Sequence, residues 1–248
     1  MTTAADSKTT QNALDQLRVK LFADGADRES IAKLARDPRI AGFTTNPTLM
    51  RKAGITDYEA FAKSLLEIID GRPISYEVFD DDLNEMRRQA LKIATWGDNV
   101  YAKIPVSNTK SQSTAPLVRE LTAQGIKLNV TALMTDRQVD IVAEALTGSA
   151  GAYVSVFAGR VADTGRDPLP IIERSVALLT SHPTLGLIWA SPRELLNVFQ
   201  ADAAGVHIIT ATHDILAKLE LVDKDLDEYS LDTVKMFHRD AMAAGYKL

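Results

Sequence analysis

The sequence predicts an α/β fold, a single (β/α)8 TIM barrel with an N-terminal arm and an extra C-terminal helix. From Val19 onward, short β-branched or aromatic runs alternate with longer amphipathic stretches, which is typical of βα units around a parallel sheet. Eight such units follow at roughly 30-residue spacing, with no linker rich in Pro, Gly or Ser. The chain has 248 residues, and one such barrel needs about 250. These observations favour a closed barrel over an open, doubly wound sheet.

Each predicted strand is a short apolar run, as expected for parallel strands that are buried on both faces. In chain order the eight strands are Val19–Ala23, Gly42–Thr45, Ile74–Phe79, Val100–Val106, Ile126–Leu133, Tyr153–Phe157, Leu185–Ala190 and Val206–Thr210. We expect the arm to cover residues 1–18, the barrel 19–222 and the C-terminal helical segment 223–248. The arm is rich in Thr, Ser, Asp and Gln, and we expect one short helix in it around Asn12–Leu17.

The stretches between these strands carry apolar residues at helical spacing. Tyr58, Phe61 and Leu65 mark one such face, because residues three and four apart lie on the same side of a helix. The other predicted outer helices are Asp82–Ala94, Ser113–Gln124, Arg137–Leu146, Pro168–Leu179, Pro192–Phe199 and Asp214–Leu219. A last amphipathic helix, Ser230–Ala244, lies outside the eight units. We expect its apolar side to contact a neighbouring subunit of a homo-oligomer.

Composition excludes several classes of function. The net charge is −5, and the basic residues are scattered singly, which argues against nucleic acid as a partner. The absence of cysteine excludes disulfides, thiol nucleophiles and thiolate-bound metals. The four histidines have no metal-ligand spacing, so we expect no metal and no cofactor. No apolar run approaches the ~18 residues of a membrane span, and the start of the chain is polar, so we expect a cytoplasmic protein.

Polar residues inside buried strands are costly unless they are hydrogen-bonded or functional. Lys103 lies in the apolar run Val100–Val106. An amine that loses its hydration there is more readily neutral, and a neutral amine can attack a ketone to form a Schiff base. The other interpretation of the strand alone is structural: Lys103 reaches out to solvent at the barrel end or pairs with a carboxylate.

Two carboxylates lie at comparable positions on earlier strands. Asp24 follows the first strand, and Glu77 lies inside the third. Both can point into the barrel as acids or bases. Asp24 has the alternative of capping the next helix, for which Asp27 is a better candidate, and Glu77 has the alternative of a purely structural ion pair with Lys103.

Hydroxyl and amide groups also gather at strand ends, where the active sites of such barrels lie. Asn46 follows the second strand, although a turn explains the Asn-Pro pair equally well. Asn129 and Thr131 share one face of the fifth strand by the two-residue period. These groups can bind sugar hydroxyls. Ser155, Arg160, Ser191 and Arg193 fall at the sixth and seventh units and together can hold a phosphate, although each arginine alone is more often a surface residue.

Six of these stretches, in order, resemble motifs of the transaldolase family over roughly Val19 to Leu219. Phe22–Asp27 is similar to the family's first-strand aspartate motif, Thr44–Thr48 to TTNPS, and Lys103–Pro105 to the Schiff-base lysine motif. The remaining three are Asn129–Thr131, similar to N-x-T, Tyr153–Arg160, similar to ISPFVGR, and Ala190–Arg193, similar to ASFR. The chain departs from the family at Val156 and Pro192, and it is shorter than the classical enzymes.

The resemblance implies an enzyme without a cofactor that acts on sugar phosphates. Lys103 would form a Schiff base with a ketose phosphate, fructose 6-phosphate or sedoheptulose 7-phosphate, and Asp24 would be the general acid and base. Glu77 with Thr131 would position water. The retained dihydroxyacetone unit would be held by Asn46, Asn129 and Ser155, and the phosphate by Arg160, Ser191 and Arg193.

The family has a transferring and a releasing branch. Transaldolases resemble this chain in having Glu at position 77 and Phe at position 157, where the fructose 6-phosphate aldolase branch has Gln and Tyr. Because Phe157 has no hydroxyl to aid water attack, we expect transfer to an aldose phosphate. The alternatives are an aldolase-like enzyme that releases dihydroxyacetone and a barrel that binds sugar phosphates without catalysis.

Overall fold

Eight parallel strands close into a barrel in simple sequence order in the computed structural model, which describes residues 13–247. The strands are β1 Lys20–Asp24, β2 Ile40–Thr44, β3 Ile74–Glu77, β4 Val100–Pro105, β5 Leu128–Leu133, β6 Ala152–Val156, β7 Leu185–Trp189 and β8 Ile208–Thr212. The predicted (β/α)8 barrel is confirmed, and every predicted strand overlaps an observed one.

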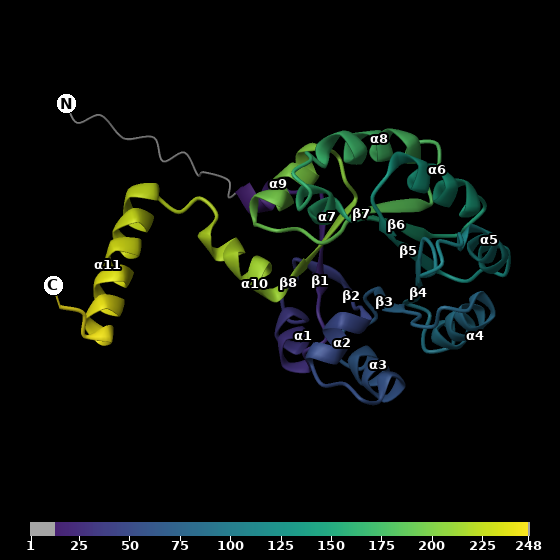
Figure 1. Ribbon diagram of the computed structural model, residues 1–248, viewed down its shortest axis with the longest axis horizontal. Helices are drawn as coiled ribbons and strands as arrows, with labels where there is room; N and C mark the ends of the chain where they lie inside the picture. Colours follow the sequence, from purple (N-terminus) through teal and green to yellow (C-terminus); the bar gives the residue numbers. More distant parts are fainter. Residues whose placement is uncertain (1–12, 248) are drawn as a thin grey trace, which may run out of the picture. The chain divides into compact units, whose positions relative to one another are not determined.

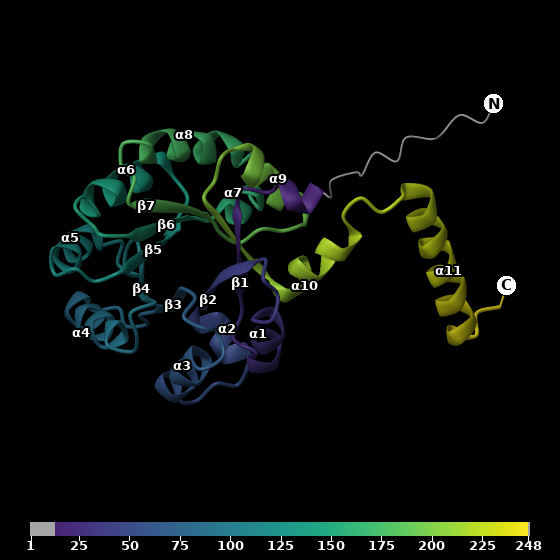
Figure 2. The same ribbon diagram turned by 180° about the vertical axis from the view of Figure 1, so that it is seen from behind.

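Helices follow the strands around the outside of the barrel, and the neighbours α4, α5, α6 and α8 pack side by side (Figure 1 and Figure 2). Their bounds are α1 Arg28–Leu34, α2 Pro47–Lys52, α3 Tyr58–Leu66, α4 Leu83–Ala94, α5 Ala115–Ala123, α6 Asp136–Ala145, α7 Ala158–Ala162, α8 Leu169–Leu179, α9 Leu196–Ala203 and α10 His213–Leu216. The short helices α2 and α7 were not among the predicted elements. The predicted helix Pro192–Phe199 was wrong at its start, because α9 begins only at Leu196.

The chain divides into two compact units, one of which is the barrel unit Arg18–Ala217. The described part of the other unit comprises the 3-10 helix η1 Ala13–Gln16 and the helix α11 Leu226–Ala244. The 3-10 helix η2 Ala217–Leu221 begins at the last residue of the barrel unit and continues into this second unit. The predicted arm helix overlaps η1, although its first residue, Asn12, lies outside the described residues. Between residues 13 and 247 no helix is long and apolar enough to cross a membrane.

Helix α11 begins at Leu226, where Asp225 caps it by accepting a hydrogen bond from the Glu228 amide at 3.0 Å. It ends at Gly245, whose φ of 66° is the left-handed conformation that glycine adopts without a Cβ penalty. None of its residues is buried. Leu226 and Phe237 expose 79% and 63% of their surface, so this helix carries large exposed apolar side chains.

An aromatic layer fills the barrel interior below the carboxyl ends of the strands. The Tyr101 and Tyr153 rings stack with centroids 4.3 Å apart, and Phe22 meets Tyr153 edge to face at 5.9 Å. Phe22 fits because Gly42 opposite it has no Cβ; an added Cβ would lie 2.4 Å from the ring. Side chains two residues further along a strand share its face, so this layer supports the polar residues above it.

Candidate active site

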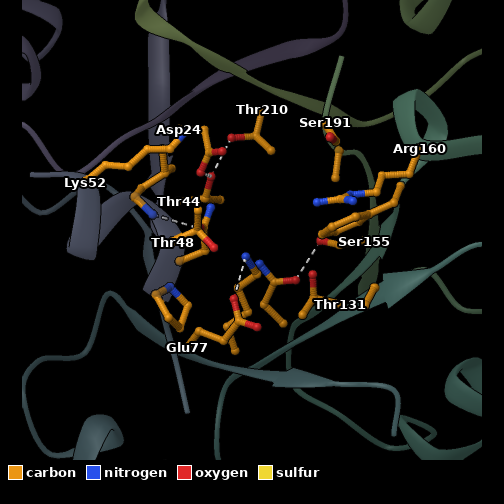
Figure 3. A pocket seen from close by; sticks show the side chains of 18 residues that line it. Asp24, Thr44, Thr48, Lys52, Glu77, Thr131, Ser155, Arg160, Ser191 and Thr210 are labelled. Carbon is orange, nitrogen blue, oxygen red and sulfur yellow. Dashed lines mark hydrogen bonds and ion pairs between the residues drawn. The ribbon is translucent and has the colours of Figure 1, made fainter. Parts of the chain in front are cut away.

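A cavity of about 500 Å³ opens at the carboxyl ends of the strands (Figure 3). It contains every predicted site residue except Arg193. The lining residues are Asp24, Thr44, Asn46, Pro47, Thr48, Leu49, Lys52, Glu77, Lys103, Asn129, Thr131, Ala132, Ser155, Phe157, Arg160, Ala190, Ser191 and Thr210. Side chains from all eight βα units therefore converge on one place.

Lys103 lies at the bottom of the cavity and is only 6% exposed. Its Nζ is 3.0 Å from Oε2 of Glu77 and donates a hydrogen bond of 3.1 Å to the backbone carbonyl of Thr45. Glu77 and Lys103 are direct partners in the ladder between β3 and β4, which places both side chains on the same inward face. The ion pair considered as a structural alternative is thus present, and it is located where a substrate can reach the amine.

Asp24 ends β1 and lies partly buried on the opposite side of the cavity from Thr131 (Figure 3). Loss of hydration raises its pKa above the ordinary 3.8, although Lys103 and the hydrogen bond from Thr44 act in the other direction. The Thr44 hydroxyl donates to Oδ1 of Asp24 at 2.7 Å and also lies 2.6 Å from the Thr210 hydroxyl. Helix α1 is capped by Asp27 instead, so capping does not account for Asp24.

A second polar network crosses the cavity floor. The Asn129 amide donates to the Ser75 hydroxyl at 2.9 Å, and the Ser155 hydroxyl donates to Oδ1 of Asn129 at 2.7 Å. All three side chains are buried, and these bonds fix the Asn129 amide in one orientation. Amide and hydroxyl groups held in this way are suited to binding the hydroxyls of a small sugar.

Thr131 stands beside this network with a buried hydroxyl that has no hydrogen-bonding partner in the described part of the chain. The ladder between β5 and β6 shifts register between Val130 and Leu133, and Ala132 has a φ of 65°. Such bulges recur beside active sites, where they redirect a side chain. An unsatisfied buried hydroxyl is costly, so Thr131 is available to a water molecule or substrate.

Helix α2 supplies the rim of the cavity on the Asp24 side. Asn46 caps this helix by accepting a hydrogen bond from the Leu49 amide at 3.0 Å, and Pro47 occupies its first turn. Asn46 therefore starts a helix where a turn was the alternative, and it also lines the cavity. Thr48 and Lys52 of α2 lie across the cavity from Arg160 and Ser191 (Figure 3).

The opposite rim comes from α7 and the loop after β7. Arg160 lies in α7 directly after Gly159, and Phe157 is the N-cap residue of that helix. Ser191 has a left-handed φ of 61°. A Cβ at Gly159 would lie 1.6 Å from the Ser191 carbonyl oxygen. Only glycine permits this close approach, which brings Arg160 and Ser191 to the same side of the cavity.

Arg193 is not in the cavity lining. Its Nε donates to Oδ1 of Asp163 at 2.8 Å, and its Nη1 donates to the Ser191 carbonyl and hydroxyl oxygens at 2.7 and 2.9 Å. Asp163 is the C-terminal cap of α7. Arg193 therefore connects the helix that carries Arg160 to the loop that carries Ser191.

Thr48, Lys52 and Thr210 were not among the predicted site residues, yet they line the cavity, as does Thr44 at the end of the predicted second strand. Thr210 could have been recognised in the same way as Lys103 and Glu77, because it is a polar residue inside a predicted strand. Lys52 carries no such signal, since it is placed by the unpredicted helix α2. Within residues 13–247, no three His, Asp or Glu side chains gather as metal ligands would.

Comparison with known proteins shows the family. Residues 21–248 match the model of the family described as transaldolase/fructose-6-phosphate aldolase. The chain belongs to this family. It is 34% identical to a probable transaldolase of Thermoanaerobacter sp. (strain X514) over 93% of this chain and 100% of that one. It is 33% identical to probable transaldolase 2 of Listeria monocytogenes over 86% of this chain and 95% of that one.

The recognised family resemblance is thereby confirmed, and the chain is an enzyme of the transaldolase family. Solved structures that are less alike in sequence show the fold alone. A mandelate oxidase mutant has a TM-score of 0.58 at 12% identity, covering 86% of this chain and 78% of that one. A putative phosphonomutase from Burkholderia cenocepacia has a TM-score of 0.55 at 13% identity, covering 92% and 96%.

The raised pKa of Asp24 predicts that its ionised carboxylate destabilises the folded chain. At pH values between the pKa of Asp24 in the unfolded chain and its higher pKa in the folded chain, the folded chain keeps a proton that the unfolded chain has released. The stabilisation that comes from this proton is therefore complete at low pH, and it is lost as the pH rises through the pKa of Asp24 in the folded chain. Asp24→Asn removes the buried charge and retains an acceptor for the Thr44 hydroxyl.

We expect Asp24→Asn to raise Tm at pH 8 by about 2–4 °C, the shift that roughly 1 kcal/mol produces in a domain of this size. The gain should shrink toward pH 4. Thermal unfolding followed by circular dichroism across this range measures it, with Asp27→Asn as the matched control, because the pKa of Asp27 is lowered by its hydrogen bonds to Ser30. A lower Tm at pH 8 for Asp24→Asn would contradict the prediction.

Proposed function

We propose that the chain is a transaldolase that moves a dihydroxyacetone unit from a ketose phosphate to an aldose phosphate. The observation that carries this proposal is the Lys103 amine, which is buried between Glu77 and the Thr45 carbonyl at the base of a polar cavity. The donors that we propose are fructose 6-phosphate and sedoheptulose 7-phosphate. The cytoplasm is the compartment that we expect for this reaction.

In the proposed reaction Lys103 transfers a proton to Glu77 and attacks the C2 carbonyl carbon of the donor. Water leaves, and the C2 carbon becomes an iminium that withdraws electrons from the C3–C4 bond. Asp24 accepts the proton of the C4 hydroxyl, the C3–C4 bond breaks, and the aldose phosphate departs. The enamine that remains on Lys103 attacks the aldehyde carbon of the acceptor, Asp24 returns its proton, and hydrolysis of the new iminium releases the product.

Binding roles follow from the positions around the amine. Asn46, Asn129 and Ser155 are proposed to hold the dihydroxyacetone hydroxyls, and the unpaired Thr131 hydroxyl to hold the water that Glu77 activates. Arg160 and Ser191 are proposed to contact the phosphate. Because Arg193 bonds to Ser191 and Asp163 in the structure, we propose that it supports the phosphate through Ser191.

Transfer is proposed over release because Phe157 lines the cavity without a hydroxyl. A hydroxyl at this position could aid the attack of water on the dihydroxyacetone intermediate, and its absence favours an intermediate that waits for the acceptor. The competing candidate is an aldolase that releases free dihydroxyacetone. A barrel that only binds sugar phosphates is disfavoured by Lys103, which is almost fully buried and yet lines the cavity.

Steady-state assays with fructose 6-phosphate and erythrose 4-phosphate test the proposal. We expect glyceraldehyde 3-phosphate to form only when erythrose 4-phosphate is present, and Lys103→Met to lower kcat by about a thousandfold or more. Lys110→Met is the matched control, since Lys110 is exposed and outside the cavity lining. Release of dihydroxyacetone at a rate independent of the acceptor would support the aldolase instead.

We also propose that the chain forms homo-oligomers through α11. Helices in proteins owe most of their stability to the packing of an amphipathic face, and none of the 19 residues of α11 is buried. An exposed apolar side marks an interaction surface. A second copy of the chain is the proposed partner, because such a side is self-complementary in symmetric assemblies.

Light scattering coupled to size-exclusion chromatography tests this assembly. The wild-type chain should elute with a mass that is a multiple of 27.1 kDa. Phe237→Glu, which puts a charge on the apolar side of α11, should lower that mass. Arg239→Glu is the control for a charge change on the same helix, because a residue two positions from Phe237 lies on the other side, and it should keep the wild-type mass. A monomeric wild-type chain would refute the proposal.

A further inference from the structure

The barrel ladder has a gap beside the candidate active site. Strands β2 and β3 pair only through Phe43 with Ile74 and through Thr44 with Ser75. Strands β3 and β4 continue their pairing up to Glu77 and Lys103. The backbone of Glu77 therefore extends beyond the last residue of β2, and its N–H and C=O on that side have no strand partner.

The Tyr58 hydroxyl takes the place of the missing strand. It donates a hydrogen bond to the Glu77 carbonyl at 2.9 Å and accepts one from the Glu77 amide at 3.0 Å. Tyr58 is the first residue of α3, whose start is fixed by the Asp57 cap. One side chain thus satisfies both backbone groups of Glu77, which otherwise would be left without partners at considerable cost.

Aromatic packing holds the Tyr58 ring in position. Its centroid lies 5.5 Å from that of Phe79, 6.2 Å from that of Trp96 and 6.4 Å from that of Tyr76. Burial raises the pKa of Tyr58, so the hydroxyl keeps its proton and remains a donor at neutral pH. The ring and the hydroxyl form a rigid support, because edge-to-face and tilted aromatic contacts fix orientation.

This support contacts the residue that pairs with the lysine. Glu77 carries the carboxylate 3.0 Å from Nζ of Lys103, and Tyr58 holds the backbone of Glu77 on both sides of its Cα. We infer that Tyr58 is a positioning residue that sets the geometry of the Lys103 amine without touching substrate, an inference that rests on the proposed role of Lys103 as nucleophile.

Tyr58→Phe tests this role, and Tyr76→Phe is its matched control. Tyr76 belongs to the same aromatic group and donates one buried hydrogen bond, to the Ala62 carbonyl at 2.9 Å. Both variants lose a hydroxyl, but of the two hydroxyls only that of Tyr58 bonds to Glu77. We expect kcat for transfer to fall by about tenfold in Tyr58→Phe while the donor KM stays within about twofold, because misplacement of a reacting group costs rate more than binding. Tyr76→Phe should keep both constants.

A second readout needs no substrate. Labelling of Lys103 by acetic anhydride, followed by peptide mass analysis, should change in rate by about threefold or more in Tyr58→Phe and stay at the wild-type rate in Tyr76→Phe. If Tyr58→Phe does not fold, Phe79→Ala carries the test, since Phe79 is 63% exposed and packs on the Tyr58 ring. That variant should change both the labelling rate and kcat.

Equal Lys103 labelling rates in wild type, Tyr58→Phe and Tyr76→Phe would overturn the inference. So would a Tyr58→Phe enzyme that raises the donor KM and keeps kcat. A wild-type chain that transfers nothing, with the labelling difference intact, would refute the proposed function alone.

Discussion

The ion pair between Lys103 and Glu77 is the interaction on which the rest of the site depends. Removing two charges from water is costly, and their mutual attraction offsets this cost only when the geometry is good and further hydrogen bonds are made. The closed barrel provides that geometry, because it pairs the two residues in register on adjacent strands. The Thr45 carbonyl supplies the further acceptor. The same pair offers a carboxylate to which the lysine can pass its proton.

Two polar networks and one hydrophobic layer surround this pair. Asp24 is bound through Thr44, and Asn129 is bound between Ser75 and Ser155. Beneath them, stacked aromatic rings occupy the barrel interior, so the polar groups face the cavity and not a second opening. The cost to stability is largest at Asp24, whose burial raises its pKa, and at the Thr131 hydroxyl, which has no hydrogen-bonding partner within residues 13–247.

The sequence was most informative where one strand determines the position of a residue. The apolar neighbours made Lys103 a candidate, and the resemblance to the transaldolase motifs made it the expected nucleophile. Most of the predicted site residues line one cavity. Residues placed by contacts between distant elements carried no comparable signal. The position of Lys52 depends on the short helix α2. Tyr58 has the spacing of an ordinary apolar residue of α3, and its bond to Glu77 cannot be inferred from that spacing. The pairing of Arg193 with Asp163 depends on how α7 meets the loop after β7.

The most direct test of the account is to trap the covalent intermediate. The wild-type chain is incubated with fructose 6-phosphate, reduced with borohydride, digested and analysed by peptide mass spectrometry. We expect the Schiff base of dihydroxyacetone, reduced to a stable amine, to be found on Lys103 and to be absent from Lys103→Met. An adduct on another lysine such as Lys52, or no adduct with any ketose phosphate, would contradict it.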